Sequence, residues 1–134
     1  MTSLTEFLFP APAPRSVAGI IQWWERRRLA YNLAVGSAGL VSLGWTAAAV
    51  SLLVGRPTLP PWQPVVVFGV MANLCYLLGP LAEVLVHKLW RHTVLPVGPA
   101  LYRIGLTFSM GLALFPTLLL ILLGVASVVF SLLG

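Results

Sequence analysis

Residues 64–88 carry four polar side chains whose types and spacing could support chemistry. Asn73, Tyr76, Glu83 and His87 place a carboxamide, a phenol, a carboxylate and an imidazole in an otherwise apolar segment. At about 100° per residue these positions fall within an arc of roughly 80° on an α-helix. Such groups are costly in hydrocarbon unless they face protein or water. The pattern therefore predicts a membrane-spanning helix with one polar stripe that other helices cover. The opposite face is acceptable to lipid and holds Met71, Leu74, Cys75, Leu78, Ala82, Leu85 and Leu89.

Glu83 is the one acidic residue inside the apolar segments, and it allows two interpretations. As a functional group, it would be a proton or cation site whose pKa is set by burial or by a nearby arginine. As a structural group, it would form an ion pair with Arg28, Arg103 or His87, the last lying one helical turn away. We expect the structural ion pair, because two other segments place an arginine at a similar depth.

Metal, haem and catalytic sites receive little support from the sequence. Glu83 with His87 and His92 is a small ligand set, His92 falls in a connecting loop, and no cysteine adds to it. Neither the serines nor Cys75 have a base in register, and the chain has no glycine-rich phosphate loop. We therefore expect no metal, no cofactor and no enzymatic activity.

The composition excludes a soluble domain. The mean hydropathy is +0.97, and 8% of the 134 residues are charged, whereas soluble proteins contain about 25% charged residues. The net charge of +5 and the pI near 10.4 would also suit a nucleic-acid-binding protein. The basic residues, however, flank apolar segments, so we expect the anionic headgroups of a lipid bilayer as the counter-charge and no nucleic acid.

The expected fold is an all-α membrane protein with three transmembrane helices, which cover about 29–54, 64–90 and 100–131 and together form a domain over 29–134. Residues 1–15 hold three prolines and should form a disordered lead. Residues 16–28 should form a short interfacial amphipathic helix with Ser16 as its N-cap. A straight helix from Ser16 to Val54 would be about 58 Å long, nearly twice the hydrocarbon core, so we expect a bend near Arg28.

Aromatic and basic side chains at the ends of these segments suit the headgroup level. The expected membrane-interface anchors are Trp23, Trp24, Arg26, Arg27, Trp62, Trp90 and Tyr102.

Two rows of small residues predict close helix packing. The first row is Ala34, Ala38, Ser42 and Thr46, and the second is Gly105, Ser109, Ala113 and Thr117. Depth counted from the flanking basic residues puts Asn32, Glu83 and Thr107 in an inner layer, and Ser42, Asn73 and Thr117 in an outer one. The candidate binding or polar-core residues are Arg28, Asn32, Asn73, Tyr76, Glu83, His87 and Arg103.

The basic residues predict the orientation. On the three-span scheme seven of the eight, all except Arg56, lie on one side of the membrane. The positive-inside bias places that side, and with it the N-terminus, in the cytoplasm.

Two strings resemble a known group. The motif Trp24-Glu25-x-Arg27-Arg28-x-x-Tyr31-Asn32, followed by Asn73-x-x-Tyr76-x-x-Gly79-x-x-x-Glu83, resembles small bacterial membrane proteins with a W-E-x-R-R-x-x-Y-N motif. That group implies a location in the bacterial inner membrane and no particular activity. We expect a non-enzymatic scaffold or accessory subunit that assembles with itself or with a larger membrane protein. The alternative is an oligomeric channel or transporter-like protein with a polar path along the Asn73/Glu83 stripe.

Overall fold

The computed structural model describes residues 4, 16–59, 62–90 and 96–133, and these form three long helices. They are α2 (Val17–Val54), α3 (Gln63–Trp90) and α4 (Gly98–Leu133). Each is long and apolar enough to cross a membrane. The expected class, an all-helical protein with three candidate membrane spans, is confirmed.

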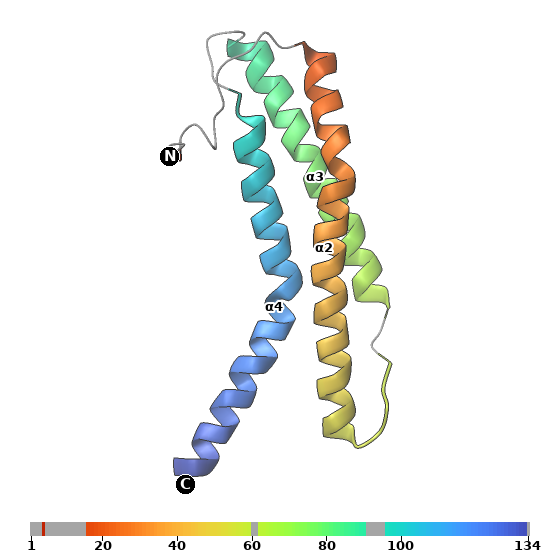
Figure 1. The fold of residues 1–134 in the computed structure, drawn as a ribbon, viewed down its shortest axis with the longest axis vertical. Coiled ribbons are helices and arrows are strands. Elements are labelled where there is room, and N and C mark those ends of the chain that lie inside the picture. The colour runs from red at the N-terminus through yellow and green to blue at the C-terminus, as the bar shows by residue number, and fades with distance from the viewer. Residues whose placement is uncertain (1–3, 5–15, 60–61, 91–95, 134) are drawn as a thin grey trace.

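The three helices run alternately up and down in one bundle (Figure 1). α2 and α4 run in the same direction, and α3 runs against both. α2 packs more extensively on α4 than on α3. All three helices share the end of the bundle where α2 begins, whereas toward the other end α4 diverges from α2 and α3 is absent (Figure 1).

α2 is one continuous helix, so the expected bend near Arg28 and the separate helix over 16–28 are wrong. Ser16 does cap the helix, since its Oγ accepts a hydrogen bond from the Gly19 amide at 3.1 Å. The helix stays straight because Ile20 and Trp24 in its first turns are buried in the bundle. Packing thus extends along α2 well before Arg28. The expected disordered lead, 1–15, lies outside the described residues except for Leu4.

The two rows of small residues, each expected to give close helix packing, face each other between α2 and α4. Ala38 and Ser42 on α2 and Ser109 and Ala113 on α4 are buried. Further along, Thr117 Oγ1 donates a hydrogen bond to Ser42 Oγ at 3.0 Å. Small side chains let the two backbones approach, and the hydroxyls then bond across the interface.

Beyond this contact α4 leaves the bundle. The helix changes direction in its middle, in the part that contains Pro116 (Figure 1), as expected for a proline that removes a backbone donor. Nearly all side chains of residues 118–133 are exposed. The last half of α4 therefore packs on almost nothing in the part of the chain that the structure describes.

Candidate functional site

Five aromatic rings gather where the three helices meet. Trp23, Trp24, Tyr31, Tyr76 and Tyr102 form this aromatic cluster, with Trp24 at its centre. The Trp24 side chain is 3% exposed and makes edge-to-face contacts with Trp23, Tyr76 and Tyr102 at centroid distances of 5.4, 5.4 and 6.0 Å. Such pairs stabilise beyond their buried area by about 0.5–1.5 kcal/mol. The cluster therefore joins α2, α3 and α4 through one side chain.

The buried carboxylate of Glu83 is bonded to the same tryptophan. Trp24 Nε1 donates to Glu83 Oε2 at 2.7 Å, and Glu83 is 3% exposed. Gly98, the first residue of α4, packs on this carboxylate, since a Cβ there would lie 2.7 Å from Glu83 Cδ. Glu83 thus contacts the other two helices at the point where α4 begins.

A glycine makes room for the tryptophan ring. A Cβ built on Gly79 would lie 2.6 Å from Cζ3 and 2.9 Å from Cζ2 of Trp24. These distances are far below van der Waals contact, so only glycine allows the six-membered ring of the indole to approach α3 this closely.

Two phenols complete the contacts between helices. Tyr76 Oη donates to the Trp24 carbonyl at 2.6 Å. Tyr31 Oη donates to the Ala72 carbonyl at 3.2 Å and lies 2.7 Å from Ser109 Oγ. Because a phenol has one proton, the Ser109 hydroxyl donates to Tyr31 when Tyr31 donates to Ala72. The polar groups of the cluster are therefore used to bond helix to helix.

The expected polar stripe on α3 is only partly covered. Tyr76 and Glu83 are buried and His87 is half-buried, but Asn73 is exposed. The Asn73 side chain donates to the Gly69 carbonyl of its own helix at 3.0 Å. The stripe is thus buried between helices at Tyr76 and Glu83, whereas at Asn73 it lies on the surface. The opposite face is exposed as expected, including Met71, Leu74, Cys75, Leu78, Leu85 and Leu89.

The axial position of α3 differs from the expected one. Glu83 lies beside Trp24, whereas Asn32 and Thr107, expected in its layer, are both exposed. Glu83 was expected level with Asn32 but lies beside Trp24, eight residues earlier in α2. Relative to the expected position, α3 is therefore displaced along α2 by about 12 Å. Depth counting assumed that each span begins at its flanking basic residue. The position is instead set by the contacts of Trp24 with Gly79 and Glu83, and Trp24 precedes Arg28, the residue from which depth along α2 was counted.

Two of the three residues expected in the outer layer, Ser42 and Thr117, lie at the same level. Ser42 and Thr117 meet, so the expected register of α2 against α4 is confirmed. Asn73 belongs to neither side of this contact, because the displacement of α3 carries it away.

The arginines are arranged differently from the expected ion pairs. Arg28 Nη2 pairs with Glu25 Oε1 of its own helix at 3.0 Å, and its guanidinium lies 5.7 Å from the centroid of the Tyr76 ring. The pairing of Glu83 with Arg103 or His87 stays a prediction. Arg103 is half-buried near the start of α4.

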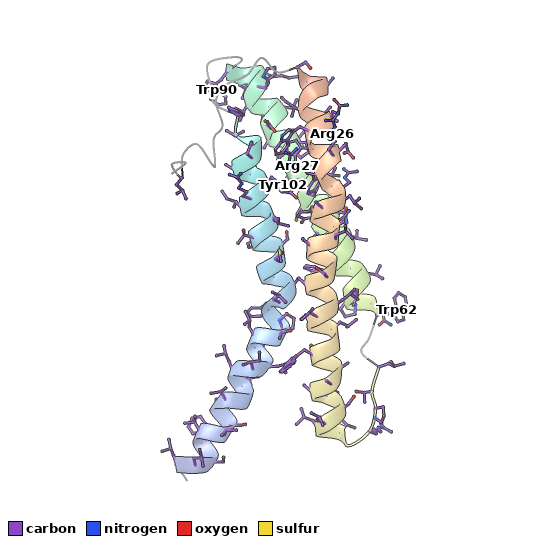
Figure 2. The ribbon with its side chains drawn as sticks, in the orientation of Figure 1. Arg26, Arg27, Trp62, Trp90 and Tyr102 are labelled. Atoms are coloured by element: carbon purple, nitrogen blue, oxygen red, sulfur yellow. The ribbon has the colours of Figure 1, made fainter. Side chains whose placement is uncertain are left out.

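Of the expected interface anchors, Trp24 is wrong because it lies in the core. Trp62 and Trp90 are exposed at opposite ends of α3, and Trp62 points away from the bundle (Figure 2). Arg26 also points outward (Figure 2). Arg27 lies 3.8 Å over the Trp23 ring, an arrangement that attracts the cation to the π-face. Tyr102 meets the edge of Trp23 at a centroid distance of 6.1 Å.

A pocket of about 300 Å³ opens between α3 and α4 beside the cluster. Its lining includes Trp24, Tyr31 and Tyr76, whose polar atoms already bond within the bundle. It suits apolar groups rather than charged ones. Within the described residues, no three His, Cys, Asp or Glu side chains lie close enough together to hold a metal ion, and His92 lies outside those residues.

Sequence reasoning missed the central role of Trp24 and the two close-packed glycines. The available signal was Gly79, a residue without a side chain inside a span, together with an indole N–H that requires a partner. Trp24 and Tyr31, from the first string of the resemblance above, meet Tyr76, Gly79 and Glu83, from the second. The resemblance itself stays a prediction. Comparisons with protein-family models, with curated proteins and with solved structures find no match to this chain.

Proposed function

We propose that this chain is a non-enzymatic, multi-pass protein of the bacterial inner membrane that acts as an accessory subunit or scaffold of a membrane assembly. The proposal is supported first by how its polar groups are used. Glu83, Tyr31 and Tyr76 bond to other helices and so stabilise the bundle. Side chains engaged in this way hold a shape rather than present reactive atoms.

The observation that carries the proposal is the divergence of α2 and α4. Below the contact of Ser42 with Thr117, the two helices continue for more than ten residues each without packing on α3. The side chains of residues 118–133 are mostly apolar and nearly all exposed, and Leu52, Leu53 and Val54 at the end of α2 are exposed as well. Apolar helix surfaces of this kind accept a helix of another membrane protein, and association of that kind needs close packing rather than a polar site.

The proposed orientation keeps the N-terminus in the cytoplasm. Among the described residues, Arg26, Arg27, Arg28, Lys88 and Arg103 lie toward one end of the bundle, and Arg56 lies beyond the other end of α2. The positive-inside bias puts the first end in the cytoplasm. Reporter fusions should place residue 95 in the cytoplasm and residues 60 and 134 outside. A cytoplasmic reporter at residue 134 would contradict three spans.

The competing hypothesis is a channel or transporter-like oligomer with a path along the Asn73/Glu83 stripe. It is less well supported, because Asn73 bonds its own backbone on the surface and Glu83 is enclosed by Trp24 and Gly98. Liposomes containing wild-type protein should therefore show no ion or proton flux above protein-free liposomes. Flux that is lost in Glu83→Gln would favour the channel.

Site-specific photo-crosslinking tests the scaffold. A benzophenone side chain replaces Leu122 on the free half of α4 or, as the matched control, Leu85 on the exposed face of α3; their exposed fractions are 67% and 56%. In native membranes, position 122 should give a discrete adduct with protein and position 85 should give adducts with lipid. Lipid adducts alone at position 122 would contradict the assembly.

A further inference from the structure

A second groove lies on the other side of α3 from the aromatic pocket, where Arg28 of α2 reaches across it. The groove has a volume of about 520 Å³. Arg28 and Asn73 are its polar members. The remaining lining is apolar and comes from α3, namely Val66, Gly69, Val70, Leu74 and Leu77. The groove therefore has one cationic side chain, and most of its remaining lining is apolar and suits a lipid acyl chain.

The Arg28 guanidinium has hydrogen-bonding capacity left. Its Nη2 bonds Glu25, but its Nε is buried and has no hydrogen-bond partner in the part of the chain that the structure describes. Because Nε is covered by protein atoms, a ligand in the groove would meet the guanidinium through its exposed part; the Arg28 side chain is 36% exposed.

The local charge also favours an anion. Glu25 compensates the charge of Arg28, but the adjacent Arg26 and Arg27 add two more positive charges. Arg26 is exposed, and Arg27 lies over the Trp23 ring. Guanidinium groups bind phosphate through paired, directional hydrogen bonds. The groove thus combines a phosphate-binding group with a surface that suits an acyl chain.

We propose that an anionic phospholipid binds in this groove, with its phosphate on Arg28 and Asn73 and one acyl chain along Val66, Val70 and Leu74. The apolar wall is what selects a lipid over free phosphate. The α3 residues that line the groove run from Val66 to Leu77, about 16 Å of helix, so a chain can lie along it rather than cross it. This inference rests on the proposed membrane location but not on the proposed assembly.

Native mass spectrometry of the full-length protein, titrated with phosphatidylglycerol or phosphatidylcholine, tests the groove. The steric variant is Gly69→Leu, because a Cβ at Gly69 meets nothing within 4 Å and the longer side chain fills the groove. Its matched control is Gly44→Leu on α2, which is equally open and lies outside the groove. The charge variant is Arg28→Gln, with Arg26→Gln as its control.

We expect one tightly bound phosphatidylglycerol per chain, with weaker binding of phosphatidylcholine. Arg28→Gln should weaken phosphatidylglycerol binding by about fivefold or more, the loss expected for one surface cation, and Gly69→Leu, which fills the groove, should weaken it at least as much. The two control variants should stay within about twofold of wild type. Equal losses in Arg28→Gln and Arg26→Gln would mean diffuse charge attraction and would overturn the groove. So would full retention of lipid by Gly69→Leu. Crosslinking from position 122 reads the assembly separately, so either proposal can fail alone.

Discussion

Gly79 offers the sharpest test of the packing described above, through the substitution Gly79→Ala. In an open position of a helix, this change stabilises by about 1 kcal/mol, because alanine restricts the unfolded backbone and favours helix. At Gly79 the new Cβ would lie 2.6 Å from Trp24 Cζ3 and 2.9 Å from Cζ2. Something must move to relieve both contacts.

The tryptophan is poorly able to move. Its indole N–H is bonded to Glu83 at 2.7 Å, and its ring is enclosed by Trp23, Tyr76 and Tyr102. Overpacking of this kind costs about 1–3 kcal/mol. Net of the helix gain, Gly79→Ala should be destabilised by up to about 2 kcal/mol.

The matched control is Gly111→Ala on α4, where a Cβ meets nothing within 4 Å. It should be neutral or more stable than wild type. The clashing atoms all belong to the six-membered ring of the indole, so Trp24→Phe should remove most of the penalty of Gly79→Ala in a double-mutant cycle. The free energy of unfolding is read from circular dichroism during SDS titration in mixed micelles. If Gly79→Ala proved as stable as Gly111→Ala, the close contact of Trp24 with α3 would be refuted.

Three further predictions concern the hydrogen bonds between helices. Trp24→Phe leaves the buried Glu83 carboxylate without its indole donor and should lower stability by about 1–3 kcal/mol; Glu83→Gln, which keeps an acceptor, should cost less, and the same SDS titration ranks the two, with the reverse order contradicting the tie. Tyr31→Phe removes the phenol that joins α2 to both other helices and should cost about 1–2 kcal/mol at unchanged helix content by circular dichroism; a neutral effect would argue against those bonds. Ser42→Ala and Thr117→Ala should couple by about 0.6 kcal/mol, the average for hydrogen bonds between membrane helices, and strictly additive effects would mean that the two hydroxyls do not meet.

The number and kind of helices follow from the sequence because membrane spans are encoded locally. Long apolar runs, prolines and glycines between them and a serine cap mark where each helix begins and ends, and α2 ends at Val54 as expected. The contact between α2 and α4 was predictable in part, since both rows were expected to give close helix packing but not to face each other. Two rows of small residues at intervals of four give the contact surface, and the spacing of Ser42 and Thr117 gives the register.

The candidate site was predictable in its members but not in their partners. Tyr76 and Glu83 were expected to be covered, and they are. Their partner, Trp24, was expected at the membrane surface, because a tryptophan beside arginines usually indicates an interface. The same pattern occurs when the indole instead packs into a neighbouring helix, and only a partner outside the local sequence distinguishes the two.

By itself, then, the sequence determined an all-helical chain with three apolar helices, one polar stripe and two small-residue rows, since each of these depends on residues within a few turns of one another. The tertiary structure alone decided how far α3 slides along α2. That position depends on the fit of the Trp24 ring against Gly79 and on the bond to Glu83, 59 residues away along the chain. Apolar surfaces slide past one another at little cost, so the axial position comes from a few close contacts, and these exist only once the helices are packed.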